Sequence, residues 1–320
     1  MMPRVSVIMP AYNAARTIAQ ALDSAFAQTF SDFEMIVADD GSTDALEEAL
    51  SPYRDRLKFL RQNHSGIAAA RNAGVAAARA DYIAFLDADD LWMPERLAKT
   101  VAVLDADPGC VLVFTGAITI DKDGTPTGEY SIDGAATLEP GLFEIVSGRP
   151  RLDASSVLMR RATFDHVGGF DAAAFGRTSR GQDSYLYSLA SELGRLRIVP
   201  EPLIKYRAEP MRNRMWKSEA GRQILMRKWR ARYGRRIRPA LRIQTAAWAR
   251  AWNQIGLDAI ERINLKVARA AFRAAWRLEP WNLRLLARFA SAYLPAPTVE
   301  RMERRRAARR RIRGAVKART

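Results

Sequence analysis

Residues 5–44 read VSVIMPAYNAARTIAQALDSAFAQTFSDFEMIVADDGSTD and decide the fold of the chain. The apolar runs 5–10 and 33–40 are typical of buried strands, and 14–28 between them carries apolar side chains at helical spacing. A strand, a helix and a second strand in this order predict a parallel pair joined by a right-handed crossover. The stretch therefore predicts the start of an α/β, doubly wound, mainly parallel sheet.

The alternation continues and then gives way to helices. Helices and strands are expected in turn at 45–50, 57–63, 65–80 and 82–87. A less regular region follows, with one bent strand or two in 110–120, a strand in 154–161 and a helix in 184–193. After Pro210 we expect helices near 218–233, 241–255, 258–277 and 281–293.

The expected domains are an α/β domain, a C-terminal helical region rich in Arg and Trp, and a basic tail, at 1–210, 211–300 and 301–320. Of the 320 residues, 48% are hydrophobic, which is typical of a globular protein. Cys110 is the single cysteine, so an internal disulfide framework is excluded. No apolar stretch reaches the roughly 18 residues that a membrane span needs, and the N-terminus lacks a secretory signal pattern. We expect a cytoplasmic protein, soluble or attached peripherally to a membrane.

The charge is divided unevenly along the chain. Residues 1–200 carry 19 Lys and Arg against 27 Asp and Glu, whereas residues 201–320 carry 32 against 8. An acidic front and a basic back indicate two regions that face different partners.

Acidic side chains gather where the expected strands end. The second strand ends in Asp39 and Asp40, and the fourth leads into Asp87, Asp89 and Asp90. Turn and cap chemistry accounts for Asp40. Three carboxylates within four positions repel one another, and a bound cation is the usual remedy. Since ligands of open parallel sheets bind at the carboxyl ends of strands, this edge is the expected binding site.

The sequence lacks the glycine-rich loops that usually bind phosphate, in either the G-x-G-x-x-G or the G-x-x-x-x-G-K-[ST] form. A diphosphate at an acidic edge therefore requires a bridging divalent cation, and oxygen ligands favour Mg²⁺ or Mn²⁺. Two histidines and one cysteine give little material for a zinc site, and His64 is expected to be a polar residue of a surface loop.

The residues so far resemble family 2 glycosyltransferases of the A-type fold, of the inverting kind that builds bacterial cell-envelope glycans. The similarity lies in the stretch 5–44 and then, in order, in AAARNAG, FLDADD, GGFD, GQDSYLY and IVPEPLIKYR. It covers about residues 3–208. Several ordered motifs make it specific, whereas a D-x-D triplet alone is common.

The resemblance implies a nucleotide pocket at the first two strand ends. Pro10, Ala11 and Tyr12 would line the pocket, and Asp39 would bind the base, usually uracil or thymine. Arg71 would approach the nucleotide or its diphosphate. The donor would thus be a UDP- or dTDP-linked sugar.

The resemblance also implies roles for the acidic cluster. Asp87 would contact the ribose or the sugar, and Asp89 would bind the divalent cation, Mn²⁺ or Mg²⁺. Asp90 is a rival for the metal, because the family motif fits in either register.

The implied catalytic base is Asp183, which would accept the proton of the acceptor hydroxyl. Its alternative role is the N-cap of the helix that follows. Gln182 departs from the usual Glu at the preceding position. A second departure lies after residue 206, where relatives carry a His: Glu209 replaces it, or Arg207 or Arg212 contacts phosphate, or the loop is built differently.

The expected function is transfer of one sugar, by an inverting, metal-dependent glycosyltransferase, to a precursor of lipopolysaccharide, capsule or exopolysaccharide. The alternatives are a catalytically silent nucleotide-sugar-binding protein and a basic scaffold for nucleic acid or membrane. For the basic helices three interpretations are open: solvated faces, contact with an anionic membrane surface, and nucleic-acid binding. Membrane contact at the inner face of the cell membrane is favoured, and nucleic acid is disfavoured because no recognition motif occurs.

Overall fold

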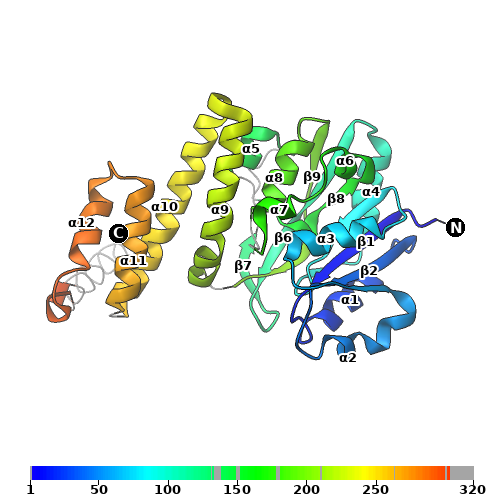
Figure 1. Ribbon diagram of the computed structural model, residues 1–320, viewed down its shortest axis with the longest axis horizontal. Helices are drawn as coiled ribbons and strands as arrows, with labels where there is room; N and C mark the ends of the chain where they lie inside the picture. Colours follow the sequence, from blue (N-terminus) through cyan, green and yellow to red (C-terminus); the bar gives the residue numbers. More distant parts are fainter. Residues whose placement is uncertain are drawn as a thin grey trace, which may run out of the picture. The chain divides into compact units, whose positions relative to one another are not determined.

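The computed structural model describes residues 2–130, 132, 138–148, 152–177, 181–209, 211–262, 264–299 and 301–302. The chain divides into two compact units (Figure 1). The first comprises Met1–Pro210 and Trp216–Ala240, and the second comprises Met211–Met215 and Leu241–Thr320.

The first unit is built on one nine-stranded sheet, in the order β3-β2-β1-β4-β8-β6-β9-β5, with β7 beside β6. The strands are β1 Val5–Ala11, β2 Phe33–Asp39, β3 Lys58–Arg61, β4 Tyr82–Phe85, β5 Leu91–Trp92, β6 Cys110–Ile120, β7 Pro126–Tyr130, β8 Leu158–Arg160 and β9 Arg195–Arg207. Strands β3, β2, β1 and β4 are parallel, which confirms the four N-terminal strands and the crossovers between them.

The second half of the sheet is mixed. Strand β8 pairs antiparallel with both β4 and β6, whereas β6 and β9 are parallel. The stretch 110–120 is a single strand. The strand predicted in 154–161 is wrong in its first half, because Ala154–Ser156 forms a 3-10 turn, η2, before β8 begins. The expected doubly wound α/β sheet is confirmed, with this mixed half as a refinement of the mainly parallel arrangement.

Helices cover both faces of the sheet (Figure 1). They are α1 Ile18–Phe26, α2 Leu46–Leu50, η1 Ser51–Arg56, α3 Ile67–Ala76, α4 Arg96–Ala106, α5 Leu142–Ser147, α6 Arg161–His166, α7 Ala172–Phe175 and α8 Gln182–Ala190. Helices α1, α2 and α4 bury their apolar side chains in one cluster with β1 and β2. Helix α3 packs so closely on β1 that a Cβ at Gly74 would lie 2.4 Å from Cγ2 of Ile8, which explains why small residues fill this helix.

Helix α9, Met211–Tyr233, continues the first unit beyond the expected domain boundary at residue 210. Trp229 is fully buried, and its Nε1 donates to Oγ of Ser188 at 2.9 Å. Arg232 pairs with Glu192 at 2.8 Å. These contacts with α8 and the residues after it place residues 216–240, including the 3-10 turn η3 Gly234–Ile237, in the first unit.

The second unit is helical, with α10 Arg238–Glu261, α11 Leu265–Leu278 and α12 Leu283–Ser291. The expected break between 255 and 258 is wrong, because α10 runs on to Glu261. Side-chain oxygens of Asn264 and Asn282 cap the next two helices. Within the described part of the chain, none of the helices combines the length and apolar character needed to cross a bilayer. The expected tail lies outside the described residues after position 302.

Candidate active site

The carboxyl ends of β1, β2 and β4 lie side by side. Strand β1 is between the other two, and its last residue, Ala11, pairs with Asp39 at the end of β2. The N–H group of Leu86 donates to the carbonyl of Ile8 at 3.0 Å, so the chain leaves β4 next to β1 and enters the acidic turn at Asp87. The structure therefore brings the predicted nucleotide and acidic residues to one edge.

Asp39 presents a buried acceptor at this edge. Its side chain is fully buried, and its Oδ1 accepts from Ser42 N–H at 2.9 Å and Ser42 Oγ at 2.6 Å. Its Oδ2 accepts no hydrogen bond from the described residues, and Arg61 Nε lies 3.5 Å away. Because a buried acceptor without a donor costs free energy, a ligand N–H is a suitable partner for this oxygen.

Asp40, by contrast, has its acceptors used by the loop that leads into α3. Its carboxylate accepts from Gln62 Nε2 at 2.7 Å and from the N–H groups of Ser65 and Gly66 at 2.8 Å each. His64 Nδ1 lies 2.8 Å from Oδ2 of Asp40 and donates to it. Asp40 is thus structural, as turn chemistry predicted.

His64 and Tyr12 form a stacked aromatic pair. Their ring centroids are 4.1 Å apart and their planes differ by 13°. Tyr12 is 46% exposed, so one face of the stack is open to a planar ligand. The sequence analysis expected His64 to be a polar residue of a surface loop and did not predict this stacking. The stacking depends on the contact of the His64 ring with Asp40 and on its place opposite Tyr12.

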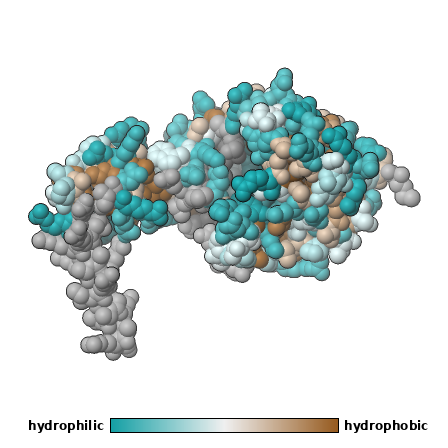
Figure 2. All heavy atoms as spheres, turned by 90° about the horizontal axis from the view of Figure 1, so that it is seen from below, coloured by the Kyte–Doolittle hydropathy of each residue, from teal (hydrophilic) through white to brown (hydrophobic). Residues whose placement is uncertain are grey.

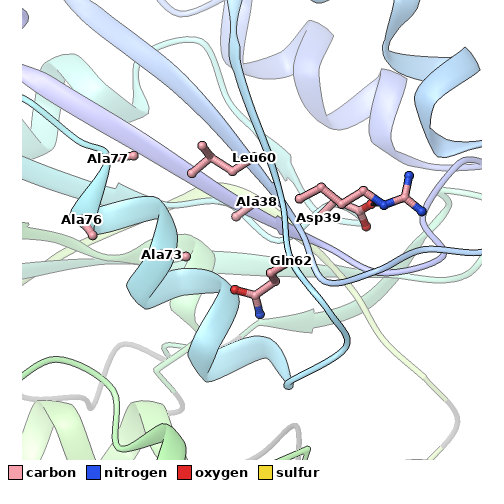
Figure 3. Close-up of a pocket in the computed structure, with 8 residues that line it drawn as sticks. Ala38, Asp39, Leu60, Gln62, Ala73, Ala76 and Ala77 are labelled. Carbon is pink, nitrogen blue, oxygen red and sulfur yellow. Dashed lines mark ion pairs between the residues drawn. The ribbon is translucent and has the colours of Figure 1, made fainter.

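A pocket of about 430 Å³ borders the Asp39 end of the sheet (Figure 3). Figure 3 shows Ala73 and Ala76 of α3 and the following Ala77 on one side, with Ala38 and Leu60 of the strands across from them. Its walls are largely apolar.

Arg71 ties α3 to the end of β4. The guanidinium is 2% exposed, and one terminal nitrogen donates to Oδ1 of Asp87 at 2.6 Å. Among the residues that the structure describes, its Nε and its other terminal nitrogen have no hydrogen-bond partner. Burial lowers the pKa of Arg71, but the carboxylates of Asp87 and Asp183 outweigh it and raise the pKa above the ordinary value. Three predicted site residues from three separate segments therefore meet here.

Asp183 lies in the first turn of α8, two residues after the N-cap, which is Gly181 at φ 96°. The alternative role of Asp183 as N-cap is therefore wrong. Tyr187 follows one turn later and is 1% exposed; burial, then the charges of Asp183 and Asp87, raise the pKa of its hydroxyl. The hydroxyl of Tyr187 and the amide of the buried Gln182 have no hydrogen-bond partner within the described part of the chain. The sequence analysis missed Tyr187, although its i+4 spacing from Asp183 is a usable signal.

The acidic turn separates Asp89 from Asp90. Asp90 is 2% exposed, and its oxygens accept from Ser155 Oγ at 2.6 Å and Arg207 N–H at 2.8 Å. Burial and its acidic neighbours raise the pKa of Asp90 well above the ordinary value. Asp89 reaches solvent, yet the protein packed around it and the charge of Asp87 raise its pKa to about 6.

Arg207 fixes the acidic turn through several hydrogen bonds. Its guanidinium donates to the carbonyl oxygens of Asp89 at 2.9 Å, Lys122 at 2.8 Å and Asp121 at 3.1 Å, and to Oε1 of Gln20 at 3.2 Å. Four of its five donors are thus committed to protein acceptors, which disfavours the phosphate contact considered from the sequence.

Glu209 lies near enough to repel Asp89, but it pairs with Lys217. The side chain of Arg212 lies outside the described residues.

Among the described residues, no three His, Cys, Asp or Glu side chains converge to hold a metal ion alone. Protein sites commonly bind Mg²⁺ and Mn²⁺ through one or two carboxylates together with substrate phosphates and water. Asp89 fits such a site: the protein packed around it and the charge of Asp87 both raise its pKa, so its charged form is poorly compensated, and a cation would stabilise that form.

Comparison with known proteins finds related sequences. The model of the family "Glycosyl transferase family 2" matches residues 6–150. EpsE of Bacillus subtilis, named as a glycosyltransferase, is 33% identical over 58% of this chain and 66% of its own length. The uncharacterized glycosyltransferase alr2836 of Nostoc is 31% identical over 66% of this chain and 67% of its own. TuaG of B. subtilis, named for teichuronic acid biosynthesis, is 38% identical over 40% and 52%.

Solved structures share the fold over most of the chain. TarS of S. aureus, residues 1–349 in complex with UDP-GlcNAc, matches with a TM-score of 0.54 and 18% identity over 94% of this chain and 92% of that one. The mannosyltransferase PcManGT of Pyrobaculum calidifontis, in complex with GDP-Man and Mn²⁺, has a TM-score of 0.55 and 22% identity over 93% and 82%.

The two acidic residues of the turn should differ in their effect on stability. Asp90→Ala leaves Ser155 Oγ and the Arg207 N–H without an acceptor, and we expect it to lower the free energy of unfolding by about 1–3 kcal/mol. Asp89→Ala removes an exposed carboxylate whose charged form is disfavoured in the folded state, so it should not lower the free energy of unfolding. Urea unfolding measures both. Equal losses in the two variants would contradict the assignment of Asp90 as structural.

Proposed function

The chain belongs to glycosyltransferase family 2, and from this premise we propose that it moves one sugar, with inversion, from a nucleoside-diphosphate sugar to a hydroxyl acceptor. The observation that carries the proposal is the meeting of Arg71, Asp87 and Asp183 beside the exposed Asp89. The chain spans about two thirds of EpsE and half of TuaG, so the substrates are part of the proposal.

The donor nucleotide is proposed to bind at the ends of β1 and β2. The base stacks on the open face of Tyr12, which His64 supports from behind. An imide N–H of uracil or thymine donates to the unused Oδ2 of Asp39, while Pro10 and Ala11 line the pocket through their backbone. The complex of TarS with UDP-GlcNAc supports a UDP-linked donor.

A divalent cation is proposed to bind Asp89, with Asp87 beside it; Asp90 is the weaker candidate because its oxygens already have partners. Bound there, Mn²⁺ or Mg²⁺ supplies charge neutralisation for the departing diphosphate. The Mn²⁺ complex of PcManGT supports this choice of ion. Buried Arg71 fixes Asp87 and keeps a positive charge close to the negatively charged donor.

Asp183 is the proposed general base. It accepts the proton of the acceptor hydroxyl as that oxygen forms its bond to the anomeric carbon, and the bond from that carbon to the diphosphate breaks on the opposite face. Its place in the first turn of α8 favours the ionised carboxylate, because the helix N-terminus carries partial positive charge. The nearby guanidinium of Arg71 also favours the ionised carboxylate of Asp183.

The acceptor is proposed to be a precursor of an envelope glycan such as lipopolysaccharide, capsule or exopolysaccharide. The naming of TuaG for teichuronic acid biosynthesis supports a polysaccharide product. An acceptor on a lipid carrier would explain a peripheral position at the inner membrane face, with the basic helices of the second unit on anionic lipid. A silent binding protein on the same fold is the competing proposal, and turnover separates the two.

A donor panel tests the enzymatic proposal. Purified full-length protein is incubated with UDP-, dTDP- and GDP-sugars, with Mn²⁺, Mg²⁺ or chelator, and the released nucleoside diphosphate is measured. We expect slow release from one UDP- or dTDP-sugar that stops with chelator. Binding of a donor without release under any metal would favour the silent binding protein.

Asp183→Asn should separate turnover from donor binding. The amide keeps the size of the side chain but accepts a proton poorly, so we expect turnover to fall by roughly 10²–10⁴-fold. The dissociation constant for the donor, measured by calorimetry, should change little. An unchanged turnover, or loss of donor binding, would contradict the role of Asp183 as base.

The raised pKa of Asp89 predicts a pH-dependent response to Mn²⁺. Below about pH 6 its carboxylate takes up a proton, which competes with the cation. Mn²⁺ with UDP should therefore raise the melting temperature more at pH 7.5 than at pH 5. Without metal the sign reverses: the folded state binds this proton more tightly than the unfolded state, so acidification through pH 6 stabilises the fold by removing a charge that burial and the neighbouring Asp87 disfavour. The Asp89→Asn variant is the control and should lack both effects.

A further inference from the structure

The second unit exposes a row of large apolar side chains at its last described helix. Trp281 is 76% exposed and Leu283 is 75% exposed. Further along lie Leu286 at 38%, Tyr293 at 48% and Leu294 at 37%. We call these five residues the apolar ridge. Soluble surfaces carry single exposed apolar residues, whereas a contiguous group marks a contact site.

The ridge follows the outward side of α12. Leu283 and Leu286 are three residues apart on the helix, and Tyr293 and Leu294 come directly after it, so the spacing keeps them near one face. The opposite side buries Leu285 against α10 and α11. The packed side of α12 is thus covered by other helices of the unit, whereas the ridge is a second apolar face that is exposed.

The turn that presents Trp281 is ordered by hydrogen bonds. Trp276 Nε1 donates to the carbonyl oxygen of Pro280 at 3.1 Å, and Asn282 Nδ2 donates to Oε2 of Glu279 at 3.0 Å. The side-chain oxygen of Asn282 caps α12 at the N–H of Leu285. Trp281 therefore projects from a fixed helix-helix corner, which lowers the entropic cost of using it as an anchor.

Positive charge surrounds the ridge. Between residues 264 and 294 the cations number six against one anion, Glu279: Lys266, Arg269, Arg273, Arg277, Arg284 and Arg288. Arg273, Arg277 and Arg284 are exposed. On the face of the second unit seen in Figure 2, brown apolar surface lies directly beside teal hydrophilic surface. Tryptophan, leucine and arginine in this combination are typical of helices that lie at a membrane surface.

Charge decides between the possible occupants of the ridge. Contact with the same surface of a second copy would bring two strongly cationic patches together, which repels. The exposed large apolar side chains of the first unit, among the residues described, come from separate elements: Met2, Tyr12, Leu138, Phe143, Leu193 and Trp216. An anionic lipid surface suits both the charge and the apolar character of the ridge, because it attracts the arginines and accepts the apolar side chains.

We propose that the apolar ridge inserts into the interfacial layer of an anionic bilayer while the flanking arginines bind lipid phosphate groups. The proposal gives the peripheral attachment proposed above, on which it rests, a defined contact surface at Trp281 and Leu283. Lipid binding and sugar transfer are measured separately, so failure of one leaves the other intact.

Vesicle flotation tests this surface with the full-length protein. The vesicles are phosphatidylcholine alone, and phosphatidylcholine with about one third phosphatidylglycerol, at low and high salt. The double variant Trp281→Ser/Leu283→Ser removes the two most exposed members of the ridge, and Trp216→Ser, 44% exposed in the first unit, is the matched control. Circular dichroism checks that each variant is folded.

We expect wild type and Trp216→Ser to float with the anionic vesicles and the double variant to bind them roughly tenfold or more weakly. High salt should weaken the wild type. Donor turnover in solution should be the same for all three proteins. Recovery of the double variant equal to wild type, or no recovery of wild type, would overturn the proposal. So would lipid-free dimerisation in sedimentation that the double variant abolishes, because it would assign the ridge to a second copy.

Discussion

Crowded negative charge at the end of β4 is the constraint on which the site depends. Asp87, Asp89 and Asp90 lie within four consecutive positions, and each carboxylate has a different environment in the fold. Asp87 has the buried guanidinium of Arg71 at 2.6 Å. Asp90 is buried and has the Ser155 hydroxyl and the Arg207 N–H. Asp89 faces solvent, and burial by its neighbours and the charge of Asp87 outweigh its own backbone N–H and the charge of Arg207, so its pKa is raised. The two partnered carboxylates thus position Asp89, and a divalent cation is the partner proposed for its charge.

The sequence predicts this edge well because strand ends are local features. Apolar runs followed by Asp39 and Asp87 locate the ends of β2 and β4, and strand-helix alternation brings them together through parallel pairing. Long-range contacts are harder to predict from the sequence. His64 stacks on Tyr12 across two loops, and Arg207 reaches the acidic turn from more than a hundred residues away. No local pattern encodes these partners.

The predicted start of one strand and the predicted domain boundary differ from the structure, because tertiary packing outweighs the local sequence pattern at both places. Residues 154–156 look like part of a strand but form a 3-10 turn that places Ser155 between the N–H of Asp87 and the carboxylate of Asp90. Residues after 210 change composition to Arg and Trp, which suggests a new domain. Trp229 is nevertheless buried against α8, the helix that carries Asp183. The first part of the basic region therefore supports the proposed base, and only the residues from Leu241 onward, with 211–215, form the separate unit.

The central claim is that a cation on Asp89 allows a diphosphate to bind beside carboxylates. Isothermal calorimetry of UDP with wild type and Asp89→Ala, each with Mn²⁺ and with chelator, tests it most directly. The account predicts binding to wild type only with Mn²⁺, and weak binding to the variant under both conditions. Equal UDP affinity for the two proteins, or for wild type with and without metal, would contradict it.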